Sequence, residues 1–99
     1  MNPIRKTTTE GAVQRYDFSV IGTKFLVKNM SGGDILAGFE PDLETEGVDG
    51  WLIPDGAWQV IPGAESQMQR QSVYIKAYAT SQEGRGVEIE AIEYRLPRI

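Results

Sequence analysis

KFLVKNMSGGDILAGFE, residues 24–40, decides the fold expected of this chain. Two short apolar runs flank the loop of residues 31–34, which carries two adjacent glycines. Successive side chains of a strand point to opposite faces, so each run presents one apolar face. These faces consist of Phe25 and Val27 in the first run and of Ile35, Ala37 and Phe39 in the second. Two such strands around a glycine-bearing loop predict a β-hairpin.

Alternating segments on both sides of this stretch predict more strands. Residues 12–21 form a half-buried strand with Tyr16, Phe18 and Val20 inward, and Gly22-Thr23 is expected to turn tightly into the hairpin. Residues 72–79 place Val73, Ile75, Ala77 and Ala79 on one face and Tyr74, Lys76 and Tyr78 on the other. Residues 80–86, with two glycines, are expected to form a hairpin tip.

Asp55-Gly56 lies between two apolar runs, residues 50–54 and 57–61, and predicts a second hairpin. Pro54 and Pro62 stand at strand ends, where a missing N–H is tolerated best near a sheet edge. We therefore expect this pair of strands near the edge of a sheet.

The last strand, Val87 to Leu96, changes phase along its length. Val87, Ile89 and Ala91 are apolar at its start, whereas Ile92, Tyr94 and Leu96 are apolar on the opposite parity. Such a switch predicts a β-bulge near Ala91 or a strand buried on both faces at its far end. The start of this strand can therefore pack on the core, while its far end contacts either a partner protein or another part of the same chain.

Several short strands at a spacing of about ten residues, with Gly and Pro between them, indicate an all-β protein. We predict a single small antiparallel β-sandwich, jelly-roll-like, or a barrel, and the strand order stays open. At 99 residues the chain is expected to be one domain. Residues 12–99 would form the sandwich and residues 1–11 an extended N-terminal arm, either a frayed terminus or a segment that pairs with a neighbouring subunit.

The composition excludes several classes of function. There is no cysteine and no histidine, so thiolate sites, disulfides, histidine ligands and a Ser-His-Asp triad are absent. A net charge of −4 with scattered Lys and Arg argues against a nucleic-acid partner. No apolar run approaches the ~20 residues of a membrane helix, and the N-terminus lacks a secretory signal pattern. We expect synthesis in the cytoplasm, no membrane contact and no cofactor.

Residues 40–49, EPDLETEGVD, carry five carboxylates and invite a calcium hypothesis, because hard cations bind several oxygens. The pattern lacks the register of a known calcium loop, so a solvated acidic loop is favoured and no metal site is predicted.

Two other sets of residues admit a functional interpretation. Glu88 and Glu90 would project from one strand face, roughly 6–7 Å apart, as acids of a small glycosidase or other hydrolase. Acids alternating on an exposed strand also serve solubility, and this interpretation is favoured, with no catalytic residue predicted. Trp51, Trp58, Tyr74 and Tyr78 could stack on a carbohydrate or another ligand, or belong to the core and cross-strand clusters. Trp58, beside the Asp55-Gly56 turn, is the one expected to be partly exposed.

Five short motifs follow one another in a definite order. Val27-Lys28-Asn29 precedes a glycine turn and Asp34-Ile35 follows it; then come Gly50-Trp51-Leu52-Ile53-Pro54 with Gly56, Val73-Tyr74-Ile75-Lys76 and Val87-Glu88-Ile89. This order resembles small β-rich structural proteins of tailed bacteriophages. The resemblance covers residues 24–94 and transfers no functional residue. It implies a non-catalytic virion component of the head, neck or tail that contacts itself, as a homo-oligomer, or other virion proteins. We expect contacts at the arm of residues 1–11, the loop of residues 40–49 and the end, residues 92–99. From the phase switch and the aromatic positions, the candidate interface residues are Ile92, Tyr94, Leu96, Trp58, Tyr74 and Tyr78. A ligand- or carbohydrate-binding module remains the alternative.

Overall fold

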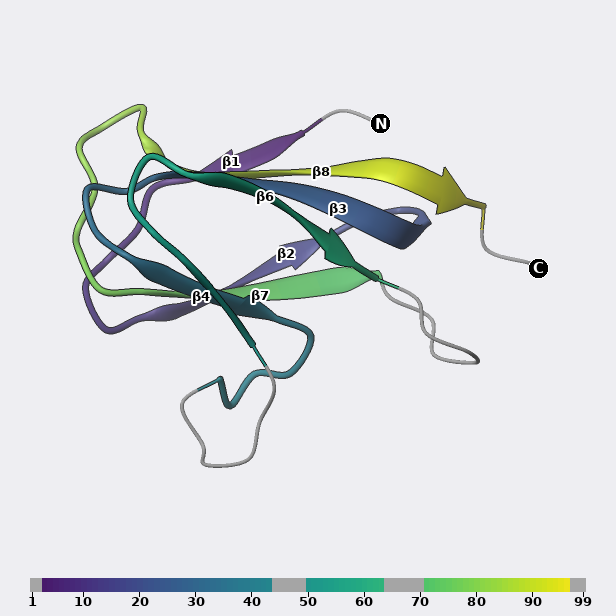
Figure 1. Ribbon diagram of the computed structural model, residues 1–99, viewed down its shortest axis with the longest axis horizontal. Helices are drawn as coiled ribbons and strands as arrows, with labels where there is room; N and C mark the ends of the chain where they lie inside the picture. The colour runs from purple at the N-terminus through teal and green to yellow at the C-terminus, as the bar shows by residue number, and fades with distance from the viewer. Residues whose placement is uncertain (1–2, 44–49, 64–70, 97–99) are drawn as a thin grey trace.

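The computed structural model describes residues 3–43, 50–63 and 71–96, and they form an all-β sandwich of two four-stranded sheets (Figure 1). Sheet A has the strand order β1-β8-β3-β6, and sheet B has the order β2-β7-β4-β5. The strands are β1 (Ile4–Lys6), β2 (Val13–Asp17), β3 (Ile21–Met30), β4 (Ile35–Gly38), β5 (Trp51–Ile53), β6 (Trp58–Pro62), β7 (Ser72–Ala77) and β8 (Gly86–Arg95). Within these ranges no helix is long and apolar enough to cross a membrane.

The strand pairing is that of a jelly roll. β1 pairs with β8, β2 with β7, β3 with β6 and β4 with β5, all antiparallel, so the chain is one long hairpin folded at β4–β5. Rolling this hairpin brings β8 beside β3 and β7 beside β4, and these two ladders complete the sheets. The jelly-roll-like sandwich expected from the sequence is confirmed, and the two sheets do not close into a barrel.

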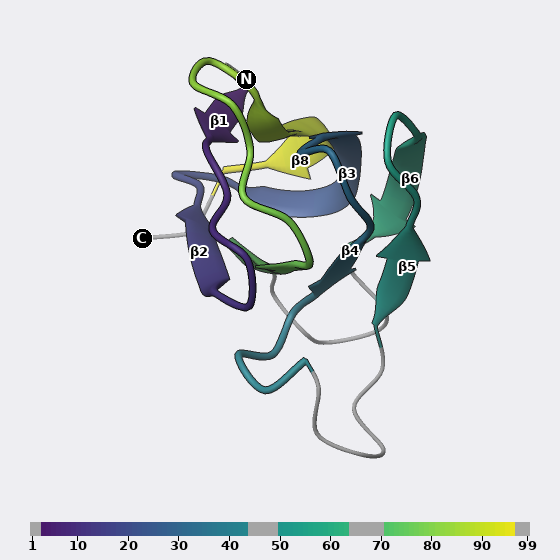
Figure 2. The same ribbon diagram turned by 90° about the vertical axis from the view of Figure 1, so that its left-hand side faces the viewer.

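Both predicted hairpins are wrong. β3 belongs to sheet A and β4 to sheet B, so the loop of residues 31–34 carries the chain from one sheet to the other. β5 and β6 likewise lie in different sheets, on either side of Asp55-Gly56 (Figure 2). Residues 78–85 also cross between sheets instead of closing a hairpin. A glycine-bearing loop between alternating strands has the same local chemistry in a hairpin and in a crossing, which explains the error.

Two expectations about turns and termini also change. Gly22-Thr23 lies inside β3 and forms no turn. In the arm, β1 pairs with residues 87–89 of the same chain, so residues 4–6 form an edge strand and are not frayed. β1 approaches the start of β8 so closely that position 86 must be glycine. Gly86 has a φ of +113°, and a Cβ at this position would overlap the Lys6 carbonyl.

The core lies between the sheets and follows the predicted alternation. Tyr16, Phe25, Val27, Ile35 and Ile75 are completely buried there. The predicted bulge is also confirmed, because the β3–β8 register jumps from Phe25↔Ala91 to Lys24↔Glu93 and leaves Ile92 without an opposite residue. The prediction that the strands flanking Asp55-Gly56 lie near an edge is confirmed for both β5 and β6.

Candidate functional site

Four crossings between the sheets gather at one end of the sandwich, on the left in Figure 1: residues 7–12, 31–34, 54–57 and 78–85. Asn29, at the end of β3, joins two of them. Its Nδ2 donates to the carbonyls of Gly33 (2.9 Å) and Ile53 (3.0 Å). Its Oδ1 accepts from the backbone N–H of Ser31 (3.0 Å) and lies 2.7 Å from the Ser31 Oγ. Because Asn29 is completely buried, these bonds satisfy polar groups that water cannot reach.

The other two crossings are joined by Thr8. Its N–H donates to the Ser81 Oγ (2.9 Å), its hydroxyl donates to the Ala79 carbonyl (2.9 Å), and its carbonyl accepts from the Ser81 N–H (3.1 Å). The crossings therefore pair in the same nested order as the strands. Asn29 joins the crossing of residues 31–34 to that of residues 54–57, and Thr8 joins residues 7–12 to residues 78–85.

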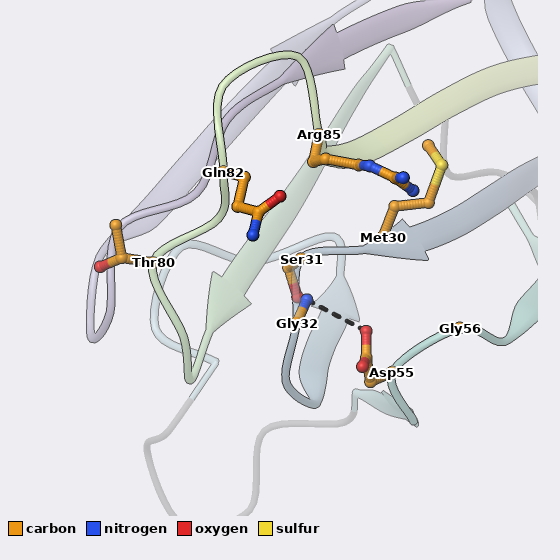
Figure 3. A pocket seen from close by; sticks show the side chains of 8 residues that line it. All are labelled: Met30, Ser31, Gly32, Asp55, Gly56, Thr80, Gln82 and Arg85. Carbon is orange, nitrogen blue, oxygen red and sulfur yellow. Dashed lines mark hydrogen bonds between the residues drawn. The ribbon is translucent and has the colours of Figure 1, made fainter.

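A cleft of about 390 Å³ lies between these two pairs of crossings (Figure 3). The residues that line it are Met30, Ser31, Gly32, Asp55, Gly56, Thr80, Gln82 and Arg85. Asp55 Oδ1 accepts from the Gly32 N–H (3.0 Å) on one wall, and Arg85 and Gln82 come from the β7–β8 crossing on the other. The cleft is open, and sequence reasoning did not find it because its walls come from three separate loops.

The cleft lacks the arrangement that hydrolysis of a glycoside needs. Such hydrolysis requires two carboxylates on either side of the bond to be broken. Asp55 is the one carboxylate among the described residues that line the cleft. The cleft can hydrogen-bond a small polar molecule, but these residues give it no acid pair for catalysis.

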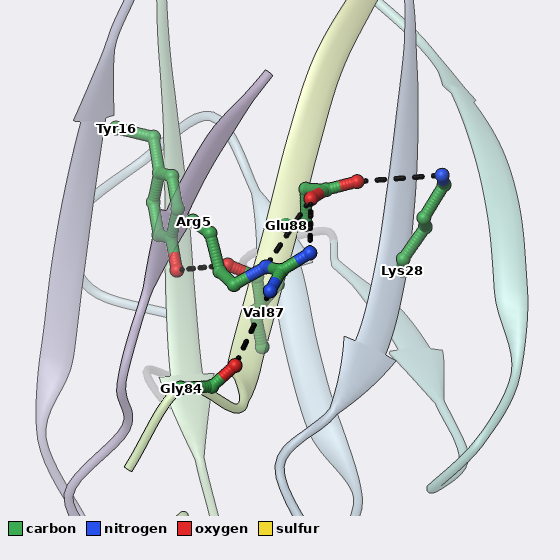
Figure 4. A network of polar contacts seen from close by, with 6 residues as sticks. All are labelled: Arg5, Tyr16, Lys28, Gly84, Val87 and Glu88. Carbon is green, nitrogen blue, oxygen red and sulfur yellow. Dashed lines mark hydrogen bonds and ion pairs between the residues drawn. The ribbon is translucent and has the colours of Figure 1, made fainter.

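Glu88, one of the acids considered for catalysis, is the centre of an ion-pair row on the outer face of sheet A (Figure 4). Arg5 reaches Glu88 Oε1 through Nη2 (2.9 Å) and Nε (3.2 Å), and the Lys28 Nζ lies 3.3 Å from Glu88 Oε2. Lys28 also stands over the Trp58 ring, 4.3 Å from its centroid. The cross-strand register Arg5↔Glu88↔Lys28↔Trp58 thus takes one residue from each strand of sheet A.

This row gives Glu88 a structural role. The hydrogen bond from Arg5, and then the Lys28 ammonium, hold the pKa of the Glu88 carboxyl below its ordinary value against the opposing effect of burial. A general acid needs the opposite shift, because it must carry a proton at neutral pH. Glu88 therefore does not have the environment of a general acid.

An apolar patch lies beside this row, at the β6 edge of sheet A. Trp58 is 63% exposed, Val60 is 46% exposed, and both point outward with Pro62. Leu26 of β3 stands directly across from Val60. We call these four residues, Leu26, Trp58, Val60 and Pro62, the β6 patch. The expected exposure of Trp58 is confirmed.

The other residues predicted to form an interface lie elsewhere. Tyr74 is on β7, on the outer face of sheet B, and Tyr78 follows the end of that strand. Ile92, Tyr94 and Leu96 are exposed at the far end of β8, from the bulge onward. The six predicted residues thus fall on three separate surfaces and do not form one site, and their role as an interface stays a prediction.

The aromatic residues do not form a common platform. Trp51 is partly buried and packs edge-on against Phe39, with ring centroids 5.9 Å apart. Trp58 lies on sheet A, whereas Tyr74 lies on sheet B. A ligand that stacks on both Trp58 and Tyr74 would therefore have to contact opposite faces of the sandwich.

The acidic segment of residues 40–49 is described only as far as Leu43, so its part from residue 44 onward lies outside the described residues. In the described ranges no three acidic side chains gather in a way that could hold a metal ion.

Sequence reasoning did not single out Val60 as a surface residue, although one signal pointed to it. In WQVIP, residues 58–62, the outward positions are all apolar, which is unusual for a strand at an exposed edge, whereas the proline that ends the strand is typical of an edge. Comparison of the chain with protein-family models, with curated proteins and with solved structures found no match.

Proposed function

We propose that this chain is a non-catalytic structural protein that assembles with copies of itself or with neighbouring proteins, as part of a bacteriophage or prophage particle. The observation that carries the assembly is the β6 patch, an apolar surface along the edge strand β6 and the adjacent Leu26, and β6 itself has no charged residue. Exposed apolar patches on edge strands are sites where other chains bind.

The other edges of the sandwich are better protected against pairing. β1 has three residues, two of them Arg5 and Lys6. β2 carries the ion pair Arg15–Asp17. β5 has three residues and is followed by Pro54. Short length, charge and proline are the means by which proteins prevent unwanted pairing at sheet edges. β6 is the edge with the least of this protection, since only Pro62 opposes pairing.

The placement in a virion rests on the order of the sequence elements and is compatible with the jelly-roll topology. Viral capsid domains use this topology, and so do lectins and cupins, so the fold supports several functions. The separation of the aromatic residues between the two sheets favours assembly over a carbohydrate-binding module.

The assembly is tested by measuring the mass in solution by light scattering after size exclusion, over a series of protein concentrations. We expect a discrete oligomer well above the 11.0 kDa of one chain. The double variant Trp58→Ser, Val60→Ser should shift this oligomer to the monomer. The matched variant Val13→Ser, Leu52→Ser removes two exposed apolar side chains from sheet B and should keep the oligomer. Equal loss in both variants would show that the β6 patch is not the contact.

The virion placement has its own test. Phage particles purified on a density gradient from the bacterium that carries the gene should contain the chain in a fixed ratio to the other particle proteins, measured by mass spectrometry. Particles without the chain, together with a persistent oligomer in solution, would contradict the virion placement and leave the assembly intact.

A further inference from the structure

The backbone of β6 has one hydrogen-bonding side turned away from the sheet. The Asn29 N–H donates to the Ala57 carbonyl and the Gly63 N–H donates to the Thr23 carbonyl, so positions 57 and 63 face β3. In an antiparallel ladder every second residue faces the same neighbour. Positions 59 and 61 therefore also face β3, while Trp58, Val60 and Pro62 direct their backbone groups to the open edge.

We infer that this edge pairs antiparallel with β6 of a second copy, about a two-fold axis at Val60, so that two sheets A become one eight-stranded sheet. Val60 then exchanges two hydrogen bonds with the partner's Val60. The Trp58 N–H of each copy donates to the carbonyl of the partner's Pro62, which gives four bonds in all. The missing N–H of Pro62 removes a bond only at the ends of this pairing, so the proline limits its length without preventing it. This inference rests on the proposed assembly and names its partner and its contact.

The side chains of the β6 patch fit the same two-fold arrangement. Val60 stands beside the partner's Val60, and Trp58 stands beside the partner's Pro62. The apolar surface therefore continues across the seam, the line where the two β6 strands pair. Cross-strand contacts between apolar and aromatic side chains are a main source of sheet stability.

The charges around the edge also favour a second copy of this chain. β6 has no charged residue, so the seam brings no like charges together although each chain carries a net charge of −4. The cations of the neighbouring strand β3 already have acidic partners, Lys24 with Glu93 (3.3 Å) and Lys28 with Glu88. Isologous contacts of this kind are the commonest way in which soluble proteins form oligomers.

A single introduced cysteine tests the axis, because the chain has no cysteine of its own. Opposite residues of a hydrogen-bonded antiparallel pair have Cα atoms about 5.5 Å apart, which a disulfide can span. The Val60→Cys variant should therefore form a covalent dimer under mild oxidation, seen on a non-reducing gel. The matched Val13→Cys variant, on the edge strand β2 with an original side chain 41% exposed, should form no covalent dimer and give only the monomer band on the same gel.

A proline at position 60 tests the hydrogen bonds. The Val60→Pro variant loses an N–H that points to the open edge, so it should keep the β3–β6 ladder and its circular-dichroism spectrum but should lose the dimer over the whole concentration series. Equal crosslinking of the two cysteine variants, or a dimer that survives Val60→Pro, would refute the β6 pairing while leaving assembly through another surface possible. A wild-type chain that is monomeric at every concentration would refute the pairing as well, and the proposed function would then depend on its presence in purified particles.

Discussion

Replacing Asn29 by alanine should destabilise the fold more than any comparable change of a polar residue. The amide of Asn29 takes part in four hydrogen bonds, with Ser31, Gly33 and Ile53, and it is completely buried. At a net contribution of ~1 kcal/mol for each bond, the loss in the free energy of unfolding is about 4 kcal/mol, because the buried partner groups of Ser31, Gly33 and Ile53 cannot form replacement hydrogen bonds to water. A domain is stable by only about 5–15 kcal/mol, so the variant should be close to unfolding at room temperature.

Urea unfolding followed by tryptophan fluorescence measures this loss. The protein should be kept dilute, because a dimer would add stability by mass action. The control is Gln14→Ala, which removes an exposed amide that donates one bond to the Thr7 carbonyl (2.8 Å). We expect the control to change the free energy of unfolding by less than about 0.5 kcal/mol, as for most surface substitutions. A loss below about 1 kcal/mol for Asn29→Ala would refute the role of Asn29 in joining the two crossings.

Three further predictions concern β1, the core and the ion-pair row. Gly86→Ala should lower the melting temperature much more than Gly84→Ala, because both glycines have a positive φ but only at position 86 would a Cβ overlap the backbone of Lys6; equal melting temperatures would contradict the tight packing of β1. Tyr16→Phe should cost about 1 kcal/mol in urea unfolding at pH 7, for the lost hydroxyl bond. Burial raises the pKa of the Tyr16 hydroxyl, so above pH 10 this hydroxyl ionises in the unfolded chain before it does in the folded protein. The free energy of unfolding of the wild type should therefore fall with rising pH more steeply than that of Tyr16→Phe, and parallel pH profiles of the two proteins would contradict this. The pH dependence expected of Glu88 runs the other way. The hydrogen bond from Arg5 is the main cause that lowers the pKa of the Glu88 carboxyl, so the ion pairs of Glu88 contribute to stability above the ordinary pKa of 4.5, and this contribution is lost as the pH falls through the lower pKa of the folded protein. The stability difference between wild type and Glu88→Gln should therefore shrink in acid, and a constant difference would argue against the ion pairs.

Alternation along the strands was enough to predict most of the core. Tyr16, Phe25 and Ile75 face inward because a period of two in hydrophobicity is a local property that any partner strand preserves. The same reasoning found the bulge at Ile92, since a bulge shifts the period by one residue.

The division of the strands between two sheets was not predictable in this way. Residues 31–34 cross between the sheets because β3 pairs with β6 and β8 whereas β4 pairs with β5 and β7. The bond from Asn29 to Ile53, which holds this crossing, joins residues 24 apart in the chain. The position of β1 depends on residues 87–89, at the other end of the sequence. Such distant contacts leave no local pattern.

The candidate surfaces show the same limit. The outward residues of β6 could be identified from the sequence, and Trp58 was correctly expected to be exposed. Their significance depends on β6 being an edge strand beside Leu26 and Lys28, and that requires the strand order. The cleft at the crossings was missed for a similar reason, because its lining comes from segments far apart in the chain.

Backbone amide exchange of β6, measured by NMR at low and at high protein concentration, tests the assembly through this strand most directly. Gln59 and Ile61 face β3 and should be protected at both concentrations, which makes them internal references. The amides of Trp58 and Val60 should exchange rapidly in the dilute protein and become protected in the concentrated protein. Rapid exchange of both amides at a concentration where the mass is already that of an oligomer would contradict the pairing of β6 with a second copy.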